Sequence, residues 1–72
     1  MIEINKIYRR EIRDFVRYAT VKQLDLMDNQ VLFSIVDKDK KGNTICREYP
    51  FQILSVVWFT ELYLKNTNHD RD

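Results

Sequence analysis

The sequence predicts a small α+β domain in which a helix, a three-stranded antiparallel sheet and a second helix (α-β-β-β-α) form two layers. Apolar residues recur at helical spacing near both ends of the chain, and they alternate with polar residues between these two segments. A chain of 72 residues is long enough for one domain only. We therefore expect a single domain over residues 1–66 and a frayed polar tail over residues 67–72.

The first segment, residues 2–18, is predicted to be an amphipathic helix. Its apolar residues follow the three-and-four spacing of one helix face, at Ile4, Ile7, Tyr8, Ile12, Phe15 and Val16, with Ala19 just beyond. The same projection gathers five cations into one stripe on the opposite face, formed by Lys6, Arg9, Arg10, Arg13 and Arg17.

This cationic stripe is a candidate binding surface for an anion. Several of its members are like charges four residues apart, and each such pair costs an isolated helix a few tenths of a kcal/mol, on the order of 0.2–0.5 kcal/mol. Arginine predominates, and its planar guanidinium suits bidentate pairing with phosphate or carboxylate. The stripe therefore indicates a nucleic acid or an acidic protein surface as partner. A solvated helix face with no partner is an equally open interpretation.

The middle of the chain is predicted to form three strands. Leu24–Leu26 and Val31–Val36 alternate in the period-two pattern of strands, and the turn-forming pair Asp28-Asn29 separates them. The polar run Asp37–Asn43 contains the single glycine, Gly42, and marks a second turn. A third strand is expected over Thr44–Tyr49.

A second helix is predicted to begin at Pro50 and to end near Asn66. Proline suits the first turn of a helix, and Lys65 suits the negative end of the helix dipole. The helix is apolar around most of its circumference, which is more than one sheet and one other helix can cover. We expect one stripe to face the core of the domain, formed by Phe51, Leu54, Trp58 and Leu62.

A second apolar stripe of this helix is the predicted protein-binding surface. Its residues are Val56, Phe59 and Tyr63, and Trp58 is added because tryptophan is enriched at binding hot spots. A third apolar stripe is formed by Ile53, Val57 and Leu64. The partner is expected to be a second copy of the chain, giving a homodimer, or another protein. The alternative is that the first helix and the sheet curve round the second helix and cover it.

Catalysis, metals and cofactors are not expected. The segment Asp37–Glu48 has the spacing of a calcium loop, but Lys41 stands where an oxygen ligand is required. Asp39 and Lys40 with upstream acids are too weak a pattern for a metal-dependent nuclease. One cysteine, Cys46, and one histidine, His69, cannot build a zinc site or a nucleophile with a placed base.

The sequence therefore predicts a non-enzymatic protein-binding module of the adaptor or inhibitor type, with a DNA- or RNA-binding domain as the alternative. A single cysteine suits a reducing compartment, and the N-terminus lacks the pattern of a secretory signal. The longest apolar segment, Phe51–Leu64, is shorter than a membrane span. We expect a cytoplasmic protein with no small-molecule substrate.

Overall fold

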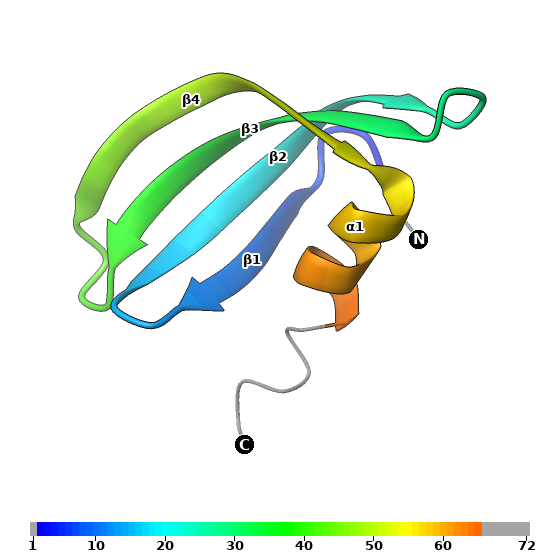
Figure 1. Cartoon of the computed structure of the whole chain (residues 1–72). Coiled ribbons are helices and arrows are strands. Elements are labelled where there is room, and N and C mark those ends of the chain that lie inside the picture. The colour runs from blue at the N-terminus through cyan, green and yellow to red at the C-terminus, as the bar shows by residue number, and fades with distance from the viewer. Residues whose placement is uncertain (1, 66–72) are drawn as a thin grey trace.

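The computed structural model describes residues 2–65, apart from the side chains of Cys46 and Arg47, and shows one antiparallel sheet with a short helical segment on one side (Figure 1). Within this range, four strands neighbour one another in chain order: β1 (Ile7–Ile12), β2 (Phe15–Asp25), β3 (Gln30–Asp39) and β4 (Thr44–Ser55). The chain then continues into α1 (Val56–Phe59) and the π-helical η1 (Thr60–Lys65). The predicted α-β-β-β-α order is therefore wrong. The predicted tail and the last residue of the predicted second helix lie outside the described residues.

The segment predicted as the first helix is a β-hairpin. β1 pairs with β2 from Ile7↔Thr20 to Ile12↔Phe15, so Arg13 and Asp14 form the two-residue turn. Arg13 takes a left-handed conformation there, with φ 39°. Most residues flanking the turn are β-branched or aromatic, and these types favour strands over helices. The strand preference of these residue types therefore outweighed the helical spacing of the apolar residues.

The two turns predicted in the middle of the chain are confirmed. β2 and β3 pair as far as Asp25↔Gln30, and Asn29 adopts φ 57° in the connecting turn. Between β3 and β4, Gly42 adopts φ 95°, a value that favours glycine. Asp39 Oδ1 accepts hydrogen bonds of 2.9 Å from the backbone N–H groups of Lys41 and Asn43, which fixes this second turn.

β4 continues through the proline that was predicted to begin the second helix. Pro50 lies in an edge strand, where a missing backbone N–H need not interrupt a ladder. It also lies at a register shift, because β4 has one more residue than β3 between the pairs Ile35↔Tyr49 and Phe33↔Gln52. Helical structure begins only at Val56, after the Ser55 hydroxyl accepts a 3.1 Å hydrogen bond from Trp58 N–H.

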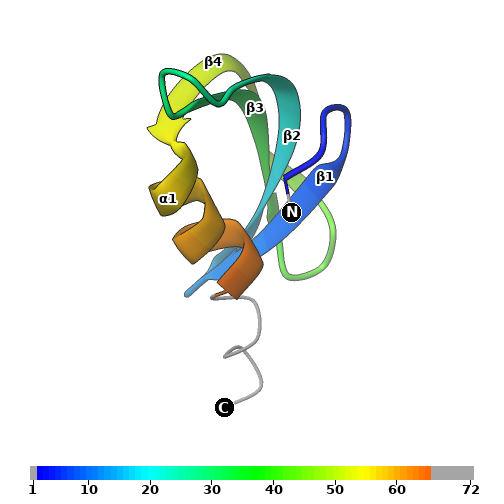
Figure 2. The same ribbon diagram turned by 90° about the vertical axis from the view of Figure 1, so that its right-hand side faces the viewer.

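The helical segment covers one face of the sheet, called here the inner face, and no other element of residues 2–65 covers the opposite, outer face (Figure 2). Phe59 is fully buried on the inner face, with its ring 5.5 Å from Tyr8 and 5.1 Å from Phe33 in edge-to-face contact. Tyr63 stacks on Phe59 at 4.6 Å. The N-terminal segment adds buried Ile2 to the same cluster. The core of the domain is therefore an aromatic cluster between the helical segment and the sheet.

Candidate functional site

The outer face of the sheet carries an apolar surface that residues 2–65 leave uncovered. Ile7 pairs with Thr20, and Thr20 pairs with Ser34, so these three residues form one row across the outer face. The row ends in β4 at the register shift that contains Phe51. Ile53 pairs with Leu32 beside this row. Ile7, Phe51 and Ile53 are 60%, 75% and 60% exposed. We call the following set the outer apolar surface: Ile7, Tyr18, Leu32, Val36, Phe51 and Ile53.

The outer apolar surface is hollowed on the side nearest β1. Ile7, Tyr18 and Val36 line a shallow depression of about 450 Å³ together with Thr20 and Lys38. The ammonium of Lys38 lies 5.6 Å from the centre of the Tyr18 ring, within the range of a cation–π contact. The depression is thus apolar along its floor and cationic at one end.

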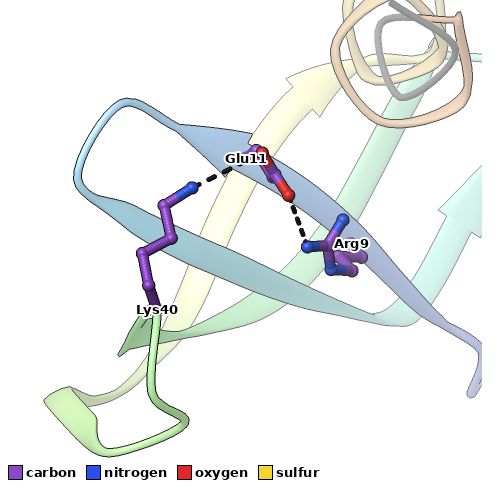
Figure 3. Close-up of polar contacts among 3 residues, drawn as sticks. All are labelled: Arg9, Glu11 and Lys40. Carbon is purple, nitrogen blue, oxygen red and sulfur yellow. Dashed lines mark hydrogen bonds and ion pairs between the residues drawn. The ribbon is translucent and has the colours of Figure 1, made fainter. Parts of the chain in front are cut away.

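A charged network lies beyond this cationic end of the outer face (Figure 3). Arg9 and Glu11 of β1 form an ion pair at 2.6 Å, and Lys40 of the β3–β4 turn lies 3.4 Å from the other carboxylate oxygen of Glu11. The hydrogen bond from Arg9 and the charge of Lys40 lower the pKa of Glu11. The Glu11 carboxylate is therefore paired with two cations. The end of the outer face formed by Arg9, Glu11, Lys38 and Lys40 carries a formal net charge of +2.

The residues predicted as a protein-binding stripe are separated by the fold. Phe59 and Tyr63 belong to the core, with 0% and 4% of their surface exposed, and Val56 packs against that core in part. Trp58 is 60% exposed. Trp58 was expected in the core and is exposed, whereas Phe59 was expected at the surface and is buried. The helix begins six residues later than predicted and packs a different side against the sheet. Phe51, expected in the core, lies instead in β4 and is exposed.

The five cations predicted to share one helix stripe are also separated, because they lie in a hairpin. Arg10 and Arg17 form a cross-strand pair on the inner face, whereas Arg9 points to the outer face. Lys6 precedes β1 and lies 3.9 Å from Glu3, and Arg13 occupies the turn. A single cationic face of the kind that tracks a phosphate backbone is not formed by these five residues.

One of the two inner-face arginines, Arg17, pairs with the one acidic side chain that is buried among the described residues. Arg17 Nε and Nη2 donate to Asp37 Oδ1 and Oδ2 at 2.8 and 2.9 Å, and Asp37 is 5% exposed. Arg10 lies over the Tyr63 ring, 5.8 Å from its centre. Burial raises the pKa of the Tyr63 hydroxyl, and the charges of Arg17 and Arg10 oppose that rise.

The segment with calcium-loop spacing is a hairpin in the structure. Asp37 pairs with Arg17. Asp39 accepts hydrogen bonds from the backbone N–H groups of Asn43 and Lys41, and these bonds lower the pKa of its carboxyl. Across the described part of the chain, no three side chains of His, Cys, Asp or Glu are grouped as metal ligands. No helix among these residues has the length and hydropathy to cross a membrane.

Sequence reasoning did not single out the outer apolar surface. The alternation of Leu32 with Phe33 and of Val36 with Ile35 gives both faces of β3 apolar residues, and that signal was present in the sequence. The exposed residues of β4 after Pro50 were not predicted as strand residues, because a helix was expected there. No known protein family matches the chain, and neither a curated protein nor a solved structure is similar to it at a significant level.

Proposed function

We propose that this protein is a small binding module that associates through the outer apolar surface, and that the surface it binds is the same surface of a second copy. The observation that carries the proposal is the exposure of Ile7, Phe51 and Ile53 on a sheet face that no element of residues 2–65 covers. A sheet with apolar residues on both faces is stable when both are covered, and large exposed apolar patches mark interfaces.

The size of the face is sufficient for a stable dimer. The described part of the molecule measures 38 × 28 × 15 Å, so its broad side exceeds the roughly 800 Å² per partner of a standard interface. Fully burying a side chain such as Phe51 or Ile53 contributes about 1.5–3 kcal/mol. Several such side chains are needed, because association itself costs an estimated 4–15 kcal/mol.

The charge pattern of the outer face supports a second copy as the partner. The end formed by Arg9, Glu11, Lys38 and Lys40 is cationic. At the opposite end Asp25 lines the outer face, Asp28 lies in the adjoining turn and Lys22 lies at the β2 bulge, and these three residues carry a formal net charge of −1. A two-fold axis across the strands would place the cationic end of one copy over the acidic end of the other. The face is thus complementary to itself in charge as well as apolar at its centre.

The first experiment measures molar mass by light scattering over a concentration series for the unmodified chain and two variants. Ile53→Asp is expected to give a monomer at concentrations where the unmodified chain is a dimer, because it buries a charge at the interface. Val57→Asp is the matched control, since Val57 is an equally exposed aliphatic residue, 63%, on the helical side. Circular dichroism verifies that each variant is folded.

The outcomes separate the outer face from the helical segment. If Val57→Asp disrupts the dimer and Ile53→Asp does not, the interface is on the helical segment, next to Trp58. An unmodified chain that stays monomeric at the highest concentration reached would contradict self-association.

A double-mutant cycle tests the orientation of the two copies. Lys38→Gln removes a cation at one end, and Asp25→Asn removes the acid at the other while keeping an oxygen to accept from Asp28 N–H. If these ends face each other, the two effects on dimer affinity are non-additive. Additive effects would contradict the antiparallel arrangement.

A further inference from the structure

A second site lies on the inner face of the sheet, and Ile53 is the one member of the outer apolar surface that also lines it. A depression of about 230 Å³ opens between β1, the sheet and η1, and its polar lining consists of Arg10, Arg17, Gln52 and the Tyr63 hydroxyl. Leu54 and Leu62 form part of its apolar wall. The pocket thus combines two guanidinium groups with a hydrocarbon surface in a space suited to a small molecule.

The two arginines stand directly opposite each other in the β1–β2 ladder. Like charges at directly opposed positions of an antiparallel pair are destabilising, so stability alone does not favour this arrangement. One of the two is compensated, because Arg17 makes its bidentate ion pair with Asp37. That pair uses two of the five N–H donors of the guanidinium, which leaves others available.

Arg10 has no such compensation within residues 2–65. Its guanidinium lies over the Tyr63 ring, and no carboxylate of the described residues is within ion-pair distance of it. The group formed by Arg10, Arg17 and Asp37 therefore carries a net charge of +1. A monovalent anion would neutralise it, whereas a dianion would leave an excess negative charge in a partly buried site.

We propose that this pocket binds the carboxylate of a small organic acid with an apolar body. Arg10 and the remaining donors of Arg17 pair with the carboxylate, since guanidinium forks match its planar geometry. Gln52 and the Tyr63 hydroxyl are placed to donate further hydrogen bonds, and Leu54 and Leu62 contact the hydrocarbon part. Binding removes the repulsion between the two arginines, so the ligand stabilises the folded chain.

Hexanoate is the probe, and hexanamide of equal size but no charge is its control. Titration of the unmodified chain, followed by backbone amide NMR signals, is expected to give saturable shifts at residues around Arg10, Arg17 and Leu62 with hexanoate only. The melting temperature should rise with hexanoate concentration and remain constant with hexanamide. This localisation needs no variant, so it holds even if substitutions in the pocket weaken folding.

Arg10→Gln is expected to weaken hexanoate binding by at least about 10-fold, the effect of losing roughly one charge-assisted hydrogen bond. Arg13→Gln is the matched control, because Arg13 occupies the exposed turn after β1 and does not line the pocket, and it should bind hexanoate as the unmodified chain does. Equal shifts with hexanamide, or equal losses in the two variants, would overturn the site. Tighter binding of inorganic phosphate than of hexanoate would overturn the assignment to a carboxylate.

A carboxylate of this kind can belong to a free acid or to the C-terminus of a peptide. A tripeptide ending in leucine, tested as the free acid and as its amide, distinguishes the two sources. Binding of hexanoate and not of the peptide acid indicates a free acid, and stronger binding of the peptide acid indicates a chain terminus. Dimerisation through the outer face is measured separately, so either proposal can fail without the other.

Discussion

The inner and outer faces of the sheet differ more in what covers them than in what they are made of. On the inner face, Phe33 and Tyr8 contact an aromatic side chain supplied by the helical segment, Phe59. On the outer face, Ile7 and Ile53 are of similar hydrophobicity but remain largely exposed. Apolar character alone thus does not identify the core of a four-stranded sheet. The position of the ten helical residues 56–65 decides which face becomes the core.

The largest expected effect is on the face that the helix covers. Phe59→Ala should lower the free energy of unfolding by about 3–5 kcal/mol, because it removes a fully buried ring and leaves a cavity. Trp58→Ala, one residue earlier and 60% exposed, should change it by less than about 1 kcal/mol. Chemical denaturation of both variants provides the comparison. Equal losses would mean that Trp58 also belongs to the core.

The next effect concerns the charges of the two faces. Arg17→Ala should cost about 2–3 kcal/mol, because it leaves the buried carboxylate of Asp37 without its bidentate partner. Arg9→Ala on the outer face breaks an exposed pair and should have a much smaller effect. Adding Asp37→Ala to Arg17→Ala should restore part of the loss. If the double variant is the least stable of the series, the unpaired carboxylate of Asp37 is not the source of the loss in Arg17→Ala.

A smaller effect is expected at the turn that joins β1 to β2. Arg13→Asn should raise the free energy of unfolding by about 0.5–1 kcal/mol, because asparagine tolerates the left-handed conformation that Arg13 adopts at φ 39°. Arg9→Asn is the control in extended backbone, where asparagine is a poor strand residue and should destabilise slightly. A destabilised Arg13→Asn variant would show that the arginine side chain itself contributes to the turn.

The last effect appears only in alkaline solution. Burial raises the pKa of Tyr63, so the folded chain keeps the phenol proton at a pH where the unfolded chain has lost it. The resulting contribution to stability is fully present below the ordinary tyrosine pKa of about 10 and is lost as the pH rises toward the folded value. Tyr63→Phe should therefore lose less stability between neutral and alkaline pH than the unmodified chain. Identical pH profiles would assign the alkaline loss to other groups.

The local turn chemistry of this protein could be predicted from the sequence. Asn29 and Gly42 take the left-handed conformations that their residue types favour, and both turns lie where Asp28-Asn29 and Asp37–Asn43 indicated them. The strand between these turns, β3, follows from the period-two alternation of Val31–Val36. Short-range steric preferences were sufficient at these positions, because they act within a few residues.

The turn at Arg13 and the strand through Pro50 could not be predicted in the same way. Arginine is not a turn-forming residue, so Asp14 alone indicated a turn after β1. The apolar residues on either side also fitted helical spacing. Proline is common in the first turn of a helix, so Pro50 predicts the start of a helix. Its tolerance here depends on β4 lying at the sheet edge, which is a property of the strand order.

The sequence by itself determined the middle hairpin, the two turns and the excess of apolar residues near the C-terminus. Only the tertiary structure decided which of those residues are core, because Phe59 lies on the side of the helix that meets the sheet and the neighbouring Trp58 does not. The same holds for the arginines, which the β1–β2 pairing divides between the outer network at Arg9 and the inner pocket at Arg10 and Arg17. Whether neighbouring residues share a face depends on the backbone period, and long-range pairing determines that period.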